Sequence, residues 1–222
     1  MANFMTVQKL ADGQKNVILK VDGVVDTSDI AATGQIGASG FTTTIGSPNI
    51  AFVAGALVPT LGQYLTFSDG TTTFSANTYI IAITDATHIV VSQNAKATNA
   101  AAAITITGTV GAVVLLDPAL LSDVIDISHT KATILRIDKV VYDVEDLLSV
   151  NLFYEATANV AIWHLVGRGK LEFDRKYGGL QSNAGAGATG RIVLTTQGWS
   201  ASAVLSFSFV IECTKQFVSN VG

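Results

Sequence analysis

The chain has 222 residues, of which 49% are hydrophobic and 14% are charged, so it is long and apolar enough to bury a core and is not intrinsically disordered. Its 13 Lys and Arg residues and 17 Asp and Glu residues give a formal net charge of −4, which provides no general attraction for phosphate backbones or anionic lipid. We therefore expect neither nucleic acid nor a membrane as a partner. Because a monomer of this size normally carries more charge, the composition predicts that neighbouring subunits cover part of the surface.

The N-terminal region is expected to be an arm that precedes the first strand. Residues 1–6 have neither a basic opening nor a continuous apolar block, so no signal peptide is expected and the protein is predicted to be made in the cytoplasm. The first strand is expected over Asn16 to Val25, followed by polar residues. Residues 1–14 are therefore predicted to form a mobile arm that lies over a partner.

The next part of the chain is predicted to be an inserted module, because charge is unevenly distributed. Residues 32–110 contain three charged side chains, Asp69, Asp85 and Lys96, and the other 27 of the 30 lie in the remaining 143 positions. This contrast predicts an insert of residues 32–110 in a discontinuous host domain of residues 1–31 and 111–222. Short β-type runs separated by turn residues predict a small β-barrel for the insert. These runs cover Phe41 to Ile45, Tyr64 to Phe67, Thr78 to Thr84, His88 to Ser92 and Ile104 to Thr107.

The host domain is predicted to be an antiparallel β-sandwich with a jelly-roll-like arrangement, and the whole chain to be all-β. After the insert its strands are expected over Ala132 to Val144, Val150 to Glu155, Val160 to Val166, Gly169 to Asp174, Arg191 to Thr196 and Ala203 to Cys213. In the last of these, apolar and polar residues alternate, which predicts one core face. Two short helical turns are expected, one capped by Asp117 with Pro118 in first position and one over Tyr142 to Leu148.

A glycine-rich segment has the spacing of a dinucleotide-binding motif but the wrong surroundings. Gly185-Ala186-Gly187-Ala188-Thr189-Gly190 matches the pattern GxGxxG, which requires a strand before it and a helix after it. Here a polar segment precedes it and the β-prone stretch Arg191 to Thr196 follows. We therefore predict a loop able to reach an adjacent subunit, and we expect no cofactor.

The titratable residues do not form a recognisable catalytic or metal-binding pattern. His88, His129 and His164 lie far apart without HxH or HExxH spacing, so no metal site is expected, and His164 is predicted to be a hydrogen-bonded strand residue. The single cysteine, Cys213, is predicted to be a buried thiol in a strand. No catalytic residue is assigned and the protein is not expected to be an enzyme.

Charged and aromatic clusters are likewise expected to be structural. Asp143, Glu145 and Asp146 are predicted to form a solvated or subunit-facing edge. The basic residues around Arg168 to Lys176 alternate with acids, which predicts cross-strand or intersubunit ion pairs. Trp163 and Trp199 are predicted to fill the sandwich core.

Several segments resemble a known family. In the host they are the opening residues 1–26 with Ala11-Asp12-Gly13-Gln14-Lys15-Asn16-Val17, the stretch Arg136-Ile137-Asp138-Lys139-Val140-Val141-Tyr142-Asp143, and the segment from Tyr177-Gly178-Gly179-Leu180 to Gly198-Trp199-Ser200. They resemble tailed-bacteriophage virion structural proteins. In the insert, Gly62 to Phe67, Tyr79 to Thr84 and Thr87 to Val91 are similar to the small β-modules that phage structural proteins often carry.

This resemblance implies a component of the virion and brings no catalytic residues with it. Decoration or cement proteins of icosahedral heads are commonly trimeric β-sandwiches, so we expect a capsid decoration protein that bridges neighbouring capsomers. The expected partners are the major capsid protein and copies of this chain, with a homotrimer favoured. The residues expected to contact a partner are Met1, Asn3, Phe4, Gln8, Gly178, Gly179, Asn183, Gly185, Gly187 and Gly190.

Two other functions stay open at this point. One is a neck, tail or other head-completion component, which a low copy number per particle would favour. The other is a receptor- or carbohydrate-binding module in the insert, which an exposed cluster of Phe41, Tyr64, Phe67, Phe74 and Tyr79 would favour. Their alternating positions are more typical of a barrel interior.

Overall fold

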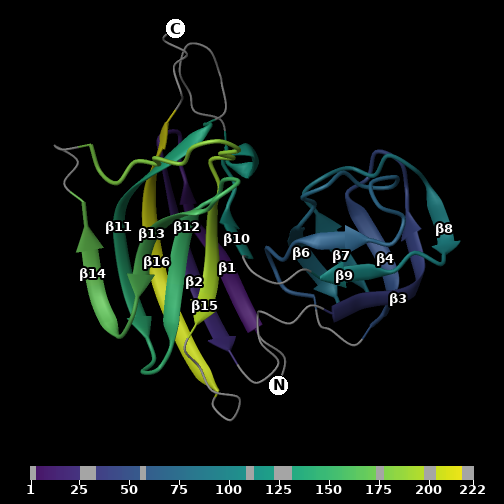
Figure 1. Cartoon of the computed structure of the whole chain (residues 1–222), viewed down its shortest axis with the longest axis horizontal. Coiled ribbons are helices and arrows are strands. Elements are labelled where there is room, and N and C mark those ends of the chain that lie inside the picture. The colour runs from purple at the N-terminus through teal and green to yellow at the C-terminus, as the bar shows by residue number, and fades with distance from the viewer. Residues whose placement is uncertain are drawn as a thin grey trace, which may run out of the picture. The chain divides into compact units, whose positions relative to one another are not determined.

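The computed structural model describes residues 4–25, 34–55, 59–108, 113–122, 132–173, 178–197 and 204–216. The chain divides into two compact units, one of residues Met1–Phe4 and Asp26–Val114 and the other of Met5–Val25 and Leu115–Gly222 (Figure 1). We call the first the insert unit, because it contains the expected insert of residues 32–110, and the second the sandwich unit. Within the described ranges, no helix reaches the length and apolarity needed to span a membrane.

The sandwich unit is built on two antiparallel sheets. The first has the strand order β1-β2-β16-β11-β14, with β1 at Phe4–Asp12, β2 at Asn16–Val25, β16 at Leu205–Gln216, β11 at Ile134–Val144 and β14 at Arg168–Glu172. The second has the order β10-β15-β12-β13, with β10 at Val113–Leu116, β15 at Ile192–Gln197, β12 at Ser149–Tyr154 and β13 at Val160–Leu165. The predicted all-β, antiparallel sandwich class is confirmed, and a jelly-roll connectivity stays a prediction.

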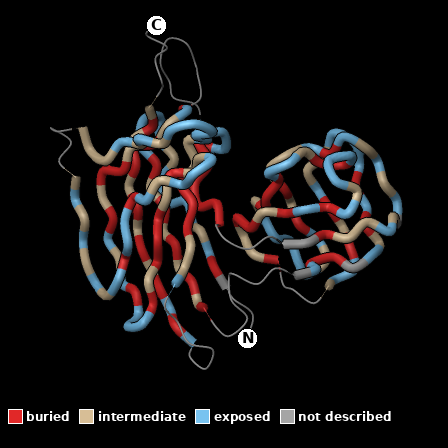
Figure 2. Tube along the Cα trace, viewed as in Figure 1, coloured by how far each residue is buried: buried red, intermediate tan, exposed pale blue. Residues whose placement is uncertain are grey.

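The alternation along β16 determines which of its side chains form the core. Leu205, Phe207, Phe209 and Ile211 are buried while the residues between them are more exposed, as Figure 2 shows for the strands of this unit. Phe209 lies opposite Val21 of β2 and Tyr142 of β11, so the three central strands have a common register. The predicted core face of this strand is therefore confirmed.

The two predicted helical turns have different outcomes. Pro118–Leu120 forms a 3-10 turn (η1), and the Ala119 N–H donates to Asp117 Oδ1 at 2.9 Å, so the predicted cap is confirmed. The prediction for Tyr142 to Leu148 is wrong. β11 continues to Val144 because its backbone pairs with both β14 and β16, and a single turn follows in which the Leu148 N–H donates to Glu145 O at 3.2 Å.

The insert unit contains a separate antiparallel sheet with the order β5-β9-β3-β4-β7-β6, and β8 pairs with β3. Its strands are β3 at Gly34–Thr43, β4 at Asn49–Ala54, β5 at Leu65–Phe67, β6 at Ile80–Asp85, β7 at His88–Val91, β8 at Asn99–Ala102 and β9 at Ile106–Gly108. One bridge, between Tyr64 and Tyr79, joins the chain next to β5 and β6, the two ends of this order. No continuous ladder between β5 and β6 is described, so a closed barrel stays a prediction.

Aromatic side chains fill the core of the insert unit. Phe67 stacks on Phe74 with ring centroids 5.0 Å apart, and Phe41 meets both rings edge-on. These three residues and Tyr79 are at most 8% exposed, whereas Tyr64 is half-buried against Tyr79. The predicted interior placement is confirmed for the four buried residues, so they do not form an exposed carbohydrate-binding cluster.

Candidate interaction surface

The predicted N-terminal arm is a strand over most of its length. Phe4–Asp12 forms β1 at the edge of the first sheet, and the β1–β2 turn is closed by the Gly13 N–H, which donates to Asn16 O at 2.9 Å. The prediction of a mobile arm is therefore wrong for these residues. Pairing with β2 makes this segment a strand, and its sequence lacks the regular alternation that would have predicted one.

The four partner-contact residues predicted in this region have different positions. Gln8 is exposed on β1, whose outer edge faces no other strand of the described sheet, and such an edge can pair with a partner. Phe4 begins β1, but its side chain lies outside the described part of the structure. Met1 and Asn3 lie outside the described residues.

The loop from Gly178 to Gly190 is anchored to the sandwich unit at its start. Leu180 forms a two-hydrogen-bond bridge with Ile137 of β11, each bond 3.0 Å long. The Tyr154 hydroxyl also donates to Leu180 O at 2.8 Å. This part of the loop is therefore held by its own strands.

The end of the same loop is anchored to the segment that follows β12. The Thr189 N–H donates to Glu155 O at 3.2 Å, and the Thr189 hydroxyl donates to the Glu155 carboxylate at 2.6 Å. The next residue but one, Arg191, forms ion pairs with Asp117 at 2.8 Å and with Glu155 at 3.4 Å. Such partly buried, charge-assisted contacts hold the loop end in one position.

The predicted contact residues of this loop divide into exposed and anchored ones. The exposed ones are Asn183, Gly185 and Gly187, and the half-buried ones are Gly178, Gly179 and Gly190. The segment Gly185 to Gly190 leads into strand β15 and not into a helix, as the β-prone residues that follow it predicted. The exposed residues in the middle of the loop stay predicted partner contacts. Because the loop is anchored at both ends, they can extend a shorter distance toward a partner than the residues of a mobile loop could.

Gly190 provides a direct test of this anchoring. Its φ is +76°, and an added Cβ would collide with the carbonyl oxygen of Thr133, so Gly190→Ala is expected to lower the free energy of unfolding by about 1–3 kcal/mol. The measurement is urea denaturation. Gly185→Ala is the matched control, because no atom lies within 4 Å of the position its Cβ would take, and it is expected to change stability by less than about 0.5 kcal/mol. Equal midpoints for the two variants would contradict the anchored loop.

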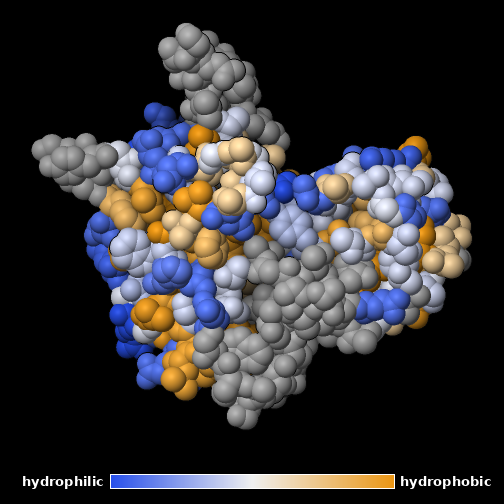
Figure 3. All heavy atoms as spheres, viewed as in Figure 1, coloured by the Kyte–Doolittle hydropathy of each residue, from blue (hydrophilic) through white to orange (hydrophobic). Residues whose placement is uncertain are grey.

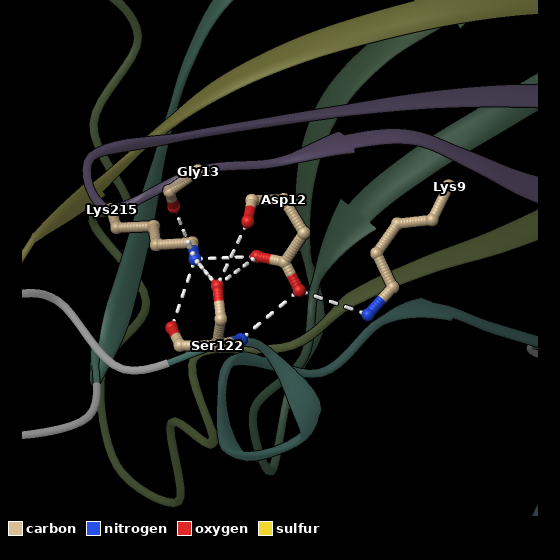
Figure 4. A network of polar contacts seen from close by, with 5 residues as sticks. All are labelled: Lys9, Asp12, Gly13, Ser122 and Lys215. Carbon is tan, nitrogen blue, oxygen red and sulfur yellow. Dashed lines mark hydrogen bonds and ion pairs between the residues drawn. The ribbon is translucent and has the colours of Figure 1, made fainter.

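A buried lysine is the centre of a polar cluster that the sequence did not single out (Figure 4). The side chain of Lys215, at an inward position of β16, is 0% exposed, and its Nζ lies 2.5 Å from Asp12 Oδ1, 2.8 Å from Gly13 O and 2.9 Å from Ser122 O. Asp12 also forms an ion pair with Lys9 at 2.9 Å. Lys215 continues the alternating positions of the buried residues of β16. This alternation was the sequence pattern from which its burial could have been predicted.

This cluster brings a serine hydroxyl and a lysine amine together, which is the arrangement of some covalent catalysts. Lys215 Nζ and Ser122 Oγ are 3.0 Å apart. The Asp12 carboxylate and the carbonyl oxygens of Gly13 and Ser122 also accept hydrogen bonds from Lys215 Nζ. These contacts join the β1–β2 turn, β16 and the residues after η1.

Two histidines make side-chain contacts on their strands, and the cysteine is buried. His164 lies on β13 with Nδ1 2.5 Å from Asn151 Oδ1, so its predicted role as a hydrogen-bonded strand residue is confirmed. His88 lies 2.9 Å from Asp85, and the Thr87 backbone N–H, His88 and the Thr87 hydroxyl lower the pKa of Asp85 to about 2. Cys213 is buried as predicted, and burial raises the pKa of its thiol.

Metal binding is not supported by the part of the chain that the structure describes. There, no group of three or more His, Cys, Asp or Glu side chains could hold a metal ion. His129 lies outside these ranges, so its surroundings are not assigned.

The outer face of the first sheet carries ion pairs within the chain. Arg168 of β14 lies 2.7 Å from Asp143 of β11, and Lys139 of β11 lies 3.3 Å from Glu212 of β16. Lys170 and Glu172 form another pair on β14. The predicted cross-strand pairing is thus confirmed for Arg168, while Arg175 and Lys176 lie outside the described residues.

The second sheet differs from the first because its strands have no charged residue. Its four strands have the sequences VVLL, IVLTTQ, SVNLFY and VAIWHL, without a single Asp, Glu, Lys or Arg. Ala161 on β13 and Gln197 on β15 are exposed there, and Phe153 on β12 is half-buried. One face of the sandwich unit is therefore charged and internally paired, and the strands of the other sheet are uncharged.

Trp163 lies at the edge of the uncharged sheet, so its predicted place in the core is wrong. It is 43% exposed and packs edge-on against Phe173, with ring centroids 6.3 Å apart. Among the described strands, β13 lies at the edge of its sheet and its register shifts next to Trp163, so none of them lies beyond the indole. Trp199 lies outside the described residues.

One end of the sandwich unit exposes three large hydrophobic side chains. Leu147 in the β11–β12 turn is 79% exposed, Val166 between β13 and β14 is 57% exposed, and Val204 just before β16 is 59% exposed. We call these three residues the Leu147 end. Figure 3 shows hydrophobic atoms at the lower end of this unit, where β11 and β13 end.

Leu147 also has an unusual backbone conformation. Its φ is +71°, in the left-handed region, which costs a residue other than glycine roughly 1–2 kcal/mol. The turn is a tight one, since the Leu148 N–H donates to Glu145 O, and glycine or asparagine is the usual residue at such a position.

The comparisons with known proteins add no family or function for this chain. No protein-family model, curated protein or solved structure matches it. The resemblance to phage virion proteins therefore stays a prediction.

Proposed function

We propose that the protein is a structural component of a tailed-phage particle, a decoration protein that binds the capsid surface and holds neighbouring capsomers together. The observation that supports this most is the difference between the two sheets of the sandwich unit. The charges on the first sheet are paired within the chain, whereas the second sheet has uncharged strands with exposed Ala161 and Trp163 at its edge. Depletion of charge is typical of the centre of a protein interface.

The proposed mechanism is mechanical. A shell under pressure from packaged DNA is weakest where capsomers meet, so a protein that contacts two capsomers raises the free energy needed to separate them. A specific contact buries about 1,600 Å² in total, and repeated copies on a symmetric shell add avidity even when each contact is modest. The partners in this proposal are the major capsid protein and further copies of the chain.

The test adds purified protein to phage heads that lack it. We expect saturable binding with a copy number that follows the number of capsomers, together with greater resistance of the heads to heat and osmotic shock. Absence of binding would overturn the proposal. A low copy number at a single vertex would instead assign the protein to the neck or tail.

Two matched variants locate the contact. Ala161→Asp places a charge on the uncharged sheet at an exposed position, so we expect it to abolish stoichiometric binding. Lys170→Gln removes a charge from the opposite, paired face and is expected to bind as the wild type does. The reverse result would place the contact on the charged sheet.

A further inference from the structure

The stability of the free chain does not explain why a leucine occupies position 147. A leucine there adopts φ +71° and leaves 79% of its surface exposed, so it adds strain to the turn and little contact with the core. Glycine would fit the same backbone without strain, and a polar residue would be better hydrated. At this position an apolar side chain contributes little to folding, whereas it is available for a contact with another molecule.

Leu147 is not alone at this end of the sandwich unit. The Val144 N–H donates to Gly167 O at 2.8 Å, which brings the β11–β12 turn next to the connection that carries Val166. The Glu145 N–H donates to Ser206 O at 3.1 Å, which places the start of β16, and thus Val204, on the other side of the turn. Three exposed apolar side chains are therefore gathered by backbone hydrogen bonds around one turn.

Charged groups of both signs surround these apolar residues. Arg168 follows Val166 by two residues and is 81% exposed, and its bonds to Asp143 use Nε and Nη2, two of the three guanidinium nitrogens. Asp146 is exposed beside Leu147, and the Glu145 carboxylate accepts hydrogen bonds from the Ser206 backbone and hydroxyl. Because the apolar centre is bordered by a cation as well as by carboxylates, a second copy of the same surface offers each of these charges a partner of opposite sign.

We propose that the Leu147 end is the surface through which copies of this chain associate. Leu147 packs against the apolar side chains of the neighbouring copy, and Arg168 of one copy meets Asp146 of the next. A closed ring of copies satisfies both contacts in every copy. This inference goes beyond capsid binding, and self-association is measured without capsids, so its failure is distinct from the failure of the proposed function.

The test compares Leu147→Gly with the wild type by sedimentation velocity over a wide range of protein concentrations. We expect the wild type to form an oligomer and the variant to associate at least about thirtyfold more weakly, as for loss of a central interface residue. At concentrations where both are monomeric, the urea midpoint of the variant is expected to be equal or higher, because glycine relieves the strained turn. Ile45→Ser, which replaces an exposed hydrophobic residue of the insert unit, is expected to leave association unchanged.

A charge exchange tests the second contact. Arg168→Glu is expected to weaken association, and Arg168→Glu combined with Asp146→Arg is expected to restore it. A wild-type protein that stays monomeric at every concentration would overturn the proposal, and so would an oligomer that Leu147→Gly leaves unchanged. If Leu147→Gly impairs binding to phage heads while a monomeric wild type binds them, the surface belongs to a capsid contact and self-association is wrong.

Discussion

Asp12→Asn is expected to lower the free energy of unfolding by about 3 kcal/mol, because it leaves the buried Lys215 ammonium without its counter-charge. The asparagine oxygen still accepts one hydrogen bond, so the loss is at the lower end of the range for a broken buried ion pair. Urea denaturation at neutral pH measures it. Lys9→Ala, which removes the more exposed partner of the same carboxylate, is the control and is expected to cost less than about 1 kcal/mol.

The contribution of Asp12 is also expected to depend on pH. Burial by itself raises the pKa of Asp12, but hydrogen bonds from Lys215, Lys9 and Ser122 lower it more, so the folded-state pKa lies well below 3.8. A carboxyl with a lowered folded-state pKa stabilises the protein fully above the unfolded-state pKa, and this stability is lost as the pH falls below it. The difference between wild type and Asp12→Asn should therefore be constant above pH 5 and shrink as the pH falls below about 3.8. A difference that does not change with pH would contradict the ionic role of Asp12.

Phe74→Ala is expected to destabilise the insert unit by about 3–5 kcal/mol, because it removes a fully buried ring that packs against Phe67 and Phe41. That loss is comparable to the whole stability of a small domain, so the insert unit is expected to lose its ordered core. Amide hydrogen exchange, read residue by residue, measures the effect.

The sandwich unit is expected to keep its hydrogen-exchange protection in this variant. The core cluster around Phe74 consists of insert-unit residues, whereas Phe207, Phe209 and Leu152 form the interior of the sandwich strands. Ile45→Ala, at a position 62% exposed in the insert unit, is the control and should change stability by less than about 0.5 kcal/mol. Loss of protection throughout the chain would contradict two separately organised cores. If the sandwich unit stays folded, the variant also shows whether the insert unit contributes to capsid binding.

The sequence was most informative where side-chain pattern and local chemistry act alone. Alternation along Leu205–Ile211 predicted which side chains of β16 are buried, and the Asp117-Pro118 pair predicted a capped turn. The β-prone residues after Gly190 predicted the strand β15. Each of these inferences depends on residues that are neighbours in the chain, so the sequence alone contains the necessary information.

Other features were decided by residues that only the tertiary structure brings together. β1 is a strand because it pairs with β2, Trp163 is exposed because β13 is an edge strand, and the loop up to Gly190 is anchored by residues of β11 and of the segment after β12. Long-range pairing also produces the Lys215 cluster and gathers three apolar side chains at the Leu147 end. The sequence alone thus determined the all-β class and the buried face of β16, because both follow from a period of two. Only the tertiary structure decided which surfaces remain open, because exposure depends on which strands have a neighbour.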